Sequence, residues 1–221
     1  ADASRIYGLE LEHILSPHNM NFLVYKDTLI EEHISGIPGD DFIKEFLPKC
    51  TESEKSQIAK EFVKFKERCL VRLLGDMRSY NYVIIPTHDF DKIIYKIRAI
   101  DFDQQSFEGN LKVYNLQFLK ENFKIVEMVN RKLDNNSINQ YKLEERSFMA
   151  KRMISSPRRA SSLIECMKND SISFDNNIQL LKKQLIKYVG DVKFKECQNM
   201  GDILETILVF VKRNYQDVLT K

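Results

Sequence analysis

The amino-acid sequence predicts an α+β protein that is mainly helical. Short segments rich in β-branched and aromatic residues lie before residue 100, whereas apolar residues recur at helical spacing over 52–73 and again beyond residue 109. The 221 residues permit one large domain or two small ones, and the 43% apolar content is enough for a substantial core. The scarcity of glycine (7) and proline (5) argues against a long flexible linker.

The first elements that we expect are a short antiparallel hairpin and a short helix. The hairpin pairs residues 22–25 with 28–34 across a two-residue turn. Glycine and proline then break the extended chain over 36–39, and a short helix over 40–46 precedes Pro48.

A long amphipathic helix is expected over residues 52–73. Thr51 and Glu54 have the spacing of a capping box, in which each side chain satisfies a free backbone N–H of the other at a helix start. Gly75 is expected to close the helix. The apolar residues that keep one helical face buried are Ile58, Phe62, Phe65, Cys69, Leu70 and Leu73.

A second hairpin and a group of helices are expected to follow. The hairpin strands are 82–86 and 93–100, and the polar residues 87–92 form its loop. Connections rich in Asn, Asp and Ser are expected at 134–137 and 168–171. Beyond Gly109 the apolar period predicts helices over 114–133, 140–154, 175–189 and 200–219.

The residues best suited to carry chemistry flank this second hairpin. Asp76 and Asn81 lie five residues apart in the loop after the long helix, and Asp101 ends the second strand of the hairpin. Phosphoryl transfer needs a carboxylate at the attacking hydroxyl and oxygen ligands for Mg²⁺, and these three side chains supply both. A structural reading stays open, in which Asp76 and Asn81 are turn residues and Asp101 caps the next segment.

The motifs Asp76-x-Arg78-x-x-Asn81 and Ile100-Asp101-Phe102-Asp103 resemble the catalytic loop and metal motif of the protein-kinase-like superfamily. The similarity is greatest to its atypical branches, namely the phosphoinositide, HipA-type and aminoglycoside kinases. The resemblance implies a kinase, a transferase that moves the γ-phosphoryl group of ATP to a hydroxyl with Mg²⁺ as cofactor. The acceptor, whether a protein or a small molecule, stays open.

The resemblance also implies a role for each residue. Asp76 would be the catalytic base, and Arg78 would neutralise phosphate charge or orient Asp76. Asn81 and Asp101 would bind the magnesium ion, with Asp103 as an auxiliary ligand.

The same resemblance divides the chain. Residues 1–34 would be the end of a small N-terminal lobe and the strand to the hinge, with nucleotide-binding backbone groups near Glu32, His33 and Ile34. Residues 35–221 would be the helical C-terminal lobe, with the catalytic loop at 75–81 and the metal motif at 100–103.

The sequence departs from the kinase pattern in two respects. About twenty residues precede the strand pair that leads to the hinge, too few for a complete small lobe, and no glycine-rich loop or strand lysine paired with a helix glutamate comes before the hinge. Asp103 also stands where many kinases have glycine. The small lobe is therefore removed, on a separate piece or absent from a minimal or inactive member, so a pseudokinase or non-catalytic interaction module is the alternative function.

Composition limits the other partners. The 34 basic and 32 acidic residues leave a net charge of +2, which gives no general reason to expect nucleic acid. No run of about 18 apolar residues occurs, so we expect no membrane span. The four cysteines form no Cys-x-x-Cys pair, and a reducing, cytoplasmic location is the simplest expectation. Ala1 could be a processed end, which leaves the source compartment open, as is the oligomeric state.

Overall fold

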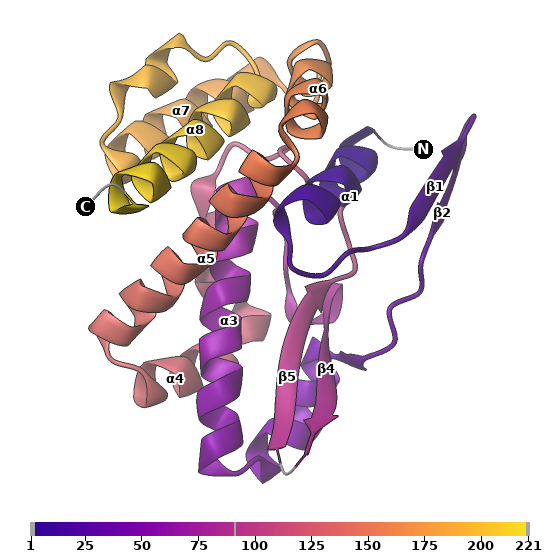
Figure 1. Ribbon diagram of the computed structural model, residues 1–221, viewed down its shortest axis with the longest axis vertical. Coiled ribbons are helices and arrows are strands. Elements are labelled where there is room, and N and C mark those ends of the chain that lie inside the picture. The colour runs from indigo at the N-terminus through magenta and orange to yellow at the C-terminus, as the bar shows by residue number, and fades with distance from the viewer. Residues whose placement is uncertain (1–2, 91, 220–221) are drawn as a thin grey trace.

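The computed structural model describes residues 3–90 and 92–219, with side chains as far as Tyr215, and it confirms an α+β fold that is mainly helical (Figure 1). Helix α1 (Ala3–Leu15) comes first. Strands β1 (Phe22–Tyr25) and β2 (Thr28–Glu31) then form an antiparallel hairpin that projects from the rest of the chain. The predicted hairpin is confirmed, but its second strand ends at Glu31, three residues earlier than expected.

A short strand and a continuous helical segment follow the projecting hairpin. Strand β3 (Ile37–Pro38) pairs with the second hairpin, and the helical segment consists of α2 (Gly39–Asp41), a π-helical turn η1 (Phe42–Phe46) and a 3-10 turn η2 (Leu47–Lys49). The expected short helix is therefore present, although it starts earlier and runs through Pro48. Proline is tolerated there because it occupies the first turn of a helical segment, where its missing N–H has no partner to lose.

Helix α3 (Glu52–Arg72) is the central helix of the molecule, and its predicted capping box is present. The Thr51 side chain accepts from the Glu54 N–H, while the Glu54 carboxylate accepts from the Thr51 N–H (2.7 Å). The expectation that Gly75 closes the helix was wrong. The chain turns at Leu73, which has a left-handed φ of 57°. Leu73 is fully buried, and its packing outweighs the backbone strain.

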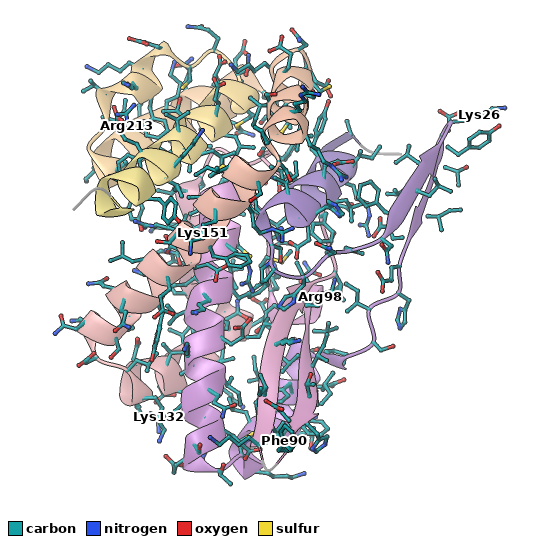
Figure 2. All side chains as sticks on the ribbon, in the orientation of Figure 1. Lys26, Phe90, Arg98, Lys132, Lys151 and Arg213 are labelled. Atoms are coloured by element: carbon teal, nitrogen blue, oxygen red, sulfur yellow. The ribbon has the colours of Figure 1, made fainter. Side chains whose placement is uncertain are left out.

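The second hairpin is longer than expected. Strands β4 (Tyr82–Asp89) and β5 (Lys92–Ala99) pair in register as far as Asp89 and Lys92. The prediction of a loop over 87–92 was wrong: residues 86–89 are exposed at every position, but they continue the ladder and pair with residues 92–95. The three-stranded sheet has the order β3-β4-β5. Figure 2 shows Phe90 at the tip of this hairpin and Lys26 at the tip of the other.

The later helices follow the prediction in part. Residues 111–122 form 3-10 turns (η4 Leu111–Tyr114, η5 Leu116–Phe118, η6 Lys120–Asn122), so the helix expected over 114–133 starts only at α4 (Phe123–Lys132). Asparagines at 110 and 115 cap these turns and break the α-helix into short pieces. The remaining helices are α5 (Asn135–Ser155), α6 (Pro157–Lys168), α7 (Asp175–Val189) and α8 (Met200–Leu219), with the 3-10 turn η7 (Val192–Glu196) between the last two.

Helix α6 was not predicted, and α5 begins before the expected boundary. A single residue, Ser156, separates α5 from Pro157 at the start of α6, and proline suits the first turn of a helix. The expected connection at 168–171 is confirmed, whereas Asp134 caps α5 with its side chain and residues 135–137 belong to the helix. None of the helices in the described residues has the length and apolar character needed to cross a membrane.

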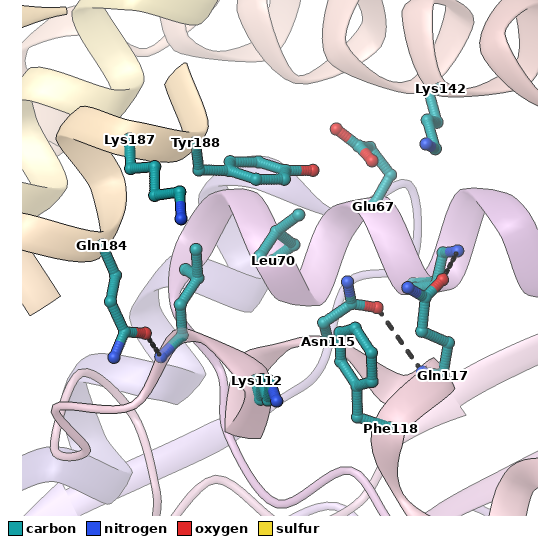
Figure 3. A pocket seen from close by; sticks show the side chains of 12 residues that line it. Glu67, Leu70, Lys112, Asn115, Gln117, Phe118, Lys142, Gln184, Lys187 and Tyr188 are labelled. Atoms are coloured by element: carbon teal, nitrogen blue, oxygen red, sulfur yellow. Dashed lines mark hydrogen bonds between the residues drawn. The ribbon is translucent and has the colours of Figure 1, made fainter. Parts of the chain in front are cut away.

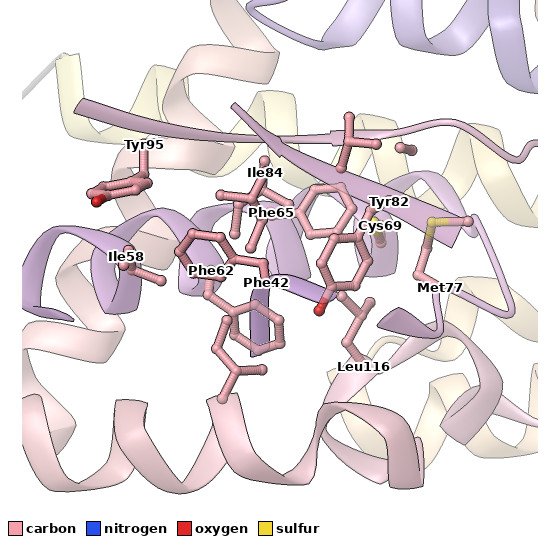
Figure 4. Close-up of a cluster of buried hydrophobic side chains, with 14 of the residues drawn as sticks. Phe42, Ile58, Phe62, Phe65, Cys69, Met77, Tyr82, Ile84, Tyr95 and Leu116 are labelled. Carbon is pink, nitrogen blue, oxygen red and sulfur yellow. The ribbon is translucent and has the colours of Figure 1, made fainter. Parts of the chain in front are cut away.

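Two apolar cores lie on either side of α3. One core fills the space between α3 and the β3-β4-β5 sheet, where Phe42, Phe62, Phe65 and Tyr82 pack together (Figure 4). The other joins the C-terminal turns of α3 to α1 and to helices α5 to α8. Because α3 contributes to both cores, the loop that follows its last turn is held on a rigid support.

Candidate functional site

The candidate site lies where the chain leaves α3 and where it leaves β5. Several backbone hydrogen bonds join these segments, and two of them flank the motifs. The N–H of Gly75 donates to the carbonyl of Gln104 (3.1 Å), and the N–H of Ile100 donates to the carbonyl of Asn81 (3.1 Å). These two bonds, called the backbone anchors below, lie at the ends of residues 75–81 and 100–104. The two segments carry the predicted catalytic and metal-binding residues.

Asp76 and Asn81 are held together within the loop. The Asp76 backbone has a left-handed φ of 54°, and its N–H donates to the carbonyl of Val113 (3.3 Å). The Nδ2 of Asn81 donates to the carbonyl of Asp76 (2.8 Å). This bond leaves the Oδ1 of Asn81 as the side-chain atom suited to a cation.

Arg78 lies against the Asp76 carboxylate. Its Nε donates to Asp76 Oδ1 (2.7 Å) and its Nη1 donates to Glu121 (3.2 Å). The hydrogen bond to Asp76 is the main cause that raises the pKa of Arg78 above its ordinary value. Arg78 therefore pairs with the Asp76 side chain in this structure, and its role in catalysis stays a prediction.

Asn122, which sequence reasoning missed, fixes the loop in place by hydrogen bonds from its side chain. This side chain is fully buried. Its Nδ2 donates to the carbonyls of Met77 (3.0 Å) and Leu116 (3.1 Å), while its Oδ1 accepts from the hydroxyl of Tyr82 (3.0 Å). A single asparagine in a polar stretch carries no sequence signal of such a role, since its partners come from distant segments.

Asp101 and Asp103 form an acidic pair that also has a basic partner. Asp101 Oδ1 accepts from the N–H of Asp103 (3.1 Å), which turns both carboxylates toward Arg5 of α1. The Nη1 of Arg5 lies 2.8 Å from Asp103 Oδ1 and 3.4 Å from Asp101 Oδ1. Arg5 also bonds both oxygens of Glu31, at 2.9 Å to Oε2. These hydrogen bonds, first that to Glu31, raise the pKa of Arg5, so the guanidinium is charged.

Helix α1 packs closely on the metal motif. A Cβ added at Gly8 would lie 2.8 Å from the Cβ of Phe102, so only glycine permits this approach. Phe102 in turn lies beneath the guanidinium of Arg72, 5.6 Å from its ring centre, and Arg72 pairs with Glu12 of α1 in the core. The position of Arg5 thus follows from a tightly packed helix, which no motif in the sequence indicated.

The residues expected near the nucleotide lie directly after Glu31. Glu32 accepts with its side chain from the N–H of Asn21 (3.0 Å), His33 is exposed, and Ile34 is buried in the core beside the sheet. Through Glu31 and Arg5 this segment is joined to Asp101 and Asp103, although its backbone role in binding adenine stays a prediction.

The donor set has the chemistry that magnesium prefers. Carboxylate and amide oxygens suit this ion, which binds proteins through one or two carboxylates and keeps several waters. Among the described residues, no group of three or more His, Cys, Asp or Glu side chains is arranged to hold a metal by itself. Asn81, Asp101 and Asp103 are thus of the residue types that magnesium binds, but in this structure both aspartates are paired with Arg5, and a magnesium site here stays a prediction.

Comparisons of the chain with protein-family models, curated proteins and solved structures found no match.

Proposed function

We propose that this chain is an ATP- and Mg²⁺-dependent phosphotransferase with a protein-kinase-like C-terminal lobe, acting on a hydroxyl group. The observation that carries the proposal is the pair of backbone anchors, Gly75 to Gln104 and Asn81 to Ile100. They bring the loop with Asp76 and the motif with Asp101 into one region from stretches twenty-five residues apart in the sequence. Phosphoryl transfer depends on such positioning more than on covalent chemistry.

In this function Asp76 accepts the proton of the substrate hydroxyl as its oxygen attacks the γ-phosphorus, and the bridging oxygen leaves with ADP. The Nε of Arg78 donates to the Asp76 carboxylate at 2.7 Å, and this contact would orient the base. Asn81 and Asp101, with Asp103 beside them, would hold Mg²⁺, which supplies charge neutralisation at the phosphates. The backbone of Glu32 to Ile34 would receive the adenine.

The first test is calorimetric titration of the chain with ATP, with and without Mg²⁺. We expect Mg²⁺-dependent ATP binding that Asp101→Ala weakens by at least tenfold, because the variant removes a ligand carboxylate. The matched control is Asp89→Ala, which removes an exposed carboxylate at the far end of the same hairpin. Equal ATP affinity in the wild type and the Asp101 variant would refute the proposed site.

A specific observation favours a second candidate, a non-catalytic interaction module. Arg5 occupies the acidic pair, and a stably bound guanidinium supplies the charge that a metal ion would otherwise bring. Arg5→Gln distinguishes the two functions. For a phosphotransferase the variant should bind Mg²⁺-ATP about tenfold more tightly, since the competing cation is gone. Absence of Mg²⁺-ATP binding in both wild type and variant, measured by thermal shift, would favour the interaction module.

A further inference from the structure

A cavity of about 540 Å³ lies on another face of α3, between this helix, α5, α7 and the 3-10 turns that begin at Leu111. None of the residues assigned above to catalysis or to magnesium lines it. Its size falls in the range of roughly 300–1,000 Å³ that is typical of sites for small organic molecules. The cavity is therefore a separate feature from the acidic site.

Four lysines line this cavity. Lys66 comes from α3, Lys112 from the 3-10 turns, Lys142 from α5 and Lys187 from α7. Within residues 3–90 and 92–215, where side chains are described, none of the four forms an ion pair. The cavity thus gathers positive charge from four different elements.

The one carboxylate in the lining does not neutralise this charge. Glu67 is buried, and its Oε1 lies 2.5 Å from the Nε of Arg146, which is its partner. Lys66 instead donates to a neutral group, the Oε1 of Gln117 (3.0 Å). The lysine ammonium groups therefore keep unused hydrogen-bond donors, because each carries three.

The electrostatic cost is largest at Lys66. The pKa of Lys66 is lowered to about 8, first by burial and then by the neighbouring charge of Lys142, against a smaller opposing effect of Glu67. A protein that keeps like charges together in a half-buried cavity sacrifices stability, unless an anion compensates them. An anion bound near Lys66 and Lys142 would offset the repulsion between them and part of the cost of burying Lys66.

The remaining lining is apolar and aromatic. Leu70 is 8% exposed, and Leu111 is partly buried against the second core. Phe118 and Tyr188 add two aromatic rings that are 48% and 53% exposed. Figure 3 shows the Tyr188 ring extended across the cavity toward Glu67, with Lys187 and Lys142 approaching from their helices. The walls therefore suit a body that is itself apolar or aromatic.

We propose that this cavity binds a small organic anion, a phosphate monoester or carboxylate with an apolar or aromatic body. The lysines at its rim bind the charged group, whereas Leu70, Leu111 and the rings of Phe118 and Tyr188 cover the body. Binding at this site requires neither ATP nor Mg²⁺.

The test uses 1-naphthyl phosphate and its uncharged analogue 1-naphthol as probes, titrated calorimetrically into the full chain. We expect the phosphate to bind at least tenfold more tightly than the naphthol. The double variant Lys142→Gln with Lys187→Gln should lose at least tenfold in affinity for the phosphate, because two of the charges are removed. Amide NMR shifts should centre on Leu70, Gln117 and Tyr188.

The matched control is Lys183→Gln, which removes an exposed lysine of α7 that does not line the cavity and should leave affinity unchanged. Equal affinities of phosphate and naphthol, or equal losses in the control and the double variant, would overturn the proposal. A lipid headgroup would present the same phosphate chemistry. The proposal would also be overturned if the protein did not bind 1-naphthyl phosphate but sedimented with phosphatidic acid vesicles in a way that depends on these lysines.

Discussion

The acidic site and the lysine-lined cavity differ in how their charged side chains are paired. At the acidic site every carboxylate of the metal motif has a cation beside it, since Arg5 reaches both Asp101 and Asp103. In the lysine-lined cavity, by contrast, ammonium groups lie together without acidic partners among the described side chains. Removing one partner of a compensated pair leaves a buried charge and is destabilising, whereas the unpaired lysines of the cavity are the basis of the proposed anion site. The acidic site needs Arg5 to move before it can bind a metal, and the cavity needs no such change.

Helix α1, which carries Arg5, is joined to α3 inside the core by the ion pair of Glu12 and Arg72. The two side chains are 1% and 5% exposed. Burial raises the pKa of Glu12, but the charges of Arg72 and Arg68 outweigh it, so the pKa lies below its ordinary value. The pair is therefore ionised at neutral pH and is the contact whose loss should affect the molecule most.

Glu12→Gln should lower the free energy of unfolding by about 3–5 kcal/mol, because it leaves Arg72 as an uncompensated buried charge. Urea unfolding at pH 7 measures this. The double variant Glu12→Leu with Arg72→Met is the control and should stay within about 1–2 kcal/mol of the wild type. Since the Glu12 pKa is depressed, its contribution is complete above pH 4.5 and disappears as the pH falls through the lower folded value. A loss below about 1 kcal/mol for Glu12→Gln would show that the pair is not compensating charge.

The close packing of α1 on the metal motif is the next contact to break. Gly8→Ala should cost about 1–3 kcal/mol of stability, since the new Cβ would meet that of Phe102 at 2.8 Å in a full core. The usual gain of alanine over glycine in a helix, about 1 kcal/mol, offsets part of this. Gly190→Ala is a useful comparison, because its left-handed φ of 81° strains alanine in an open position without any clash. Amide shifts at residues 101–103 should change for Gly8→Ala only.

How far the sequence predicts these features depends on the range of the interactions. The capping box at Thr51, the helix that it starts and the order of loop, hairpin and acidic motif all follow from residues close in the chain. The turn at Leu73 does not, because a buried leucine in a left-handed conformation depends on packing from elsewhere. Local patterns likewise missed the 3-10 turns after Gly109, where asparagine caps interrupt an otherwise helical apolar period.

The residues of the candidate site likewise fall into those that the sequence indicates and those that only the structure reveals. The spacing of Asp76, Asn81 and Asp101 is visible in the sequence, and the backbone anchors join their segments. Arg5 and Asn122 are not visible, since the first reaches the motif across ninety-six residues and the second bonds loops far from its own position. The cavity lysines also come from four separate elements, so no window of sequence contains them together.

The smallest expected effect tests the unpaired charge of the lysine-lined cavity. Lys66→Met should raise the free energy of unfolding at pH 7 by about 1 kcal/mol, because a methionine avoids burying a charge that has no acidic partner. The Lys66 pKa is lowered to about 8 in the folded state from 10.5, so the folded protein releases this proton first and wild-type stability rises between pH 8 and 10.5. The advantage of the variant should therefore shrink as urea unfolding is repeated from pH 7 to pH 10. Lys183→Met, at an exposed position of α7, should show no such pH dependence. An advantage that stays constant with pH would mean that Lys66 is not the strained charge of this cavity.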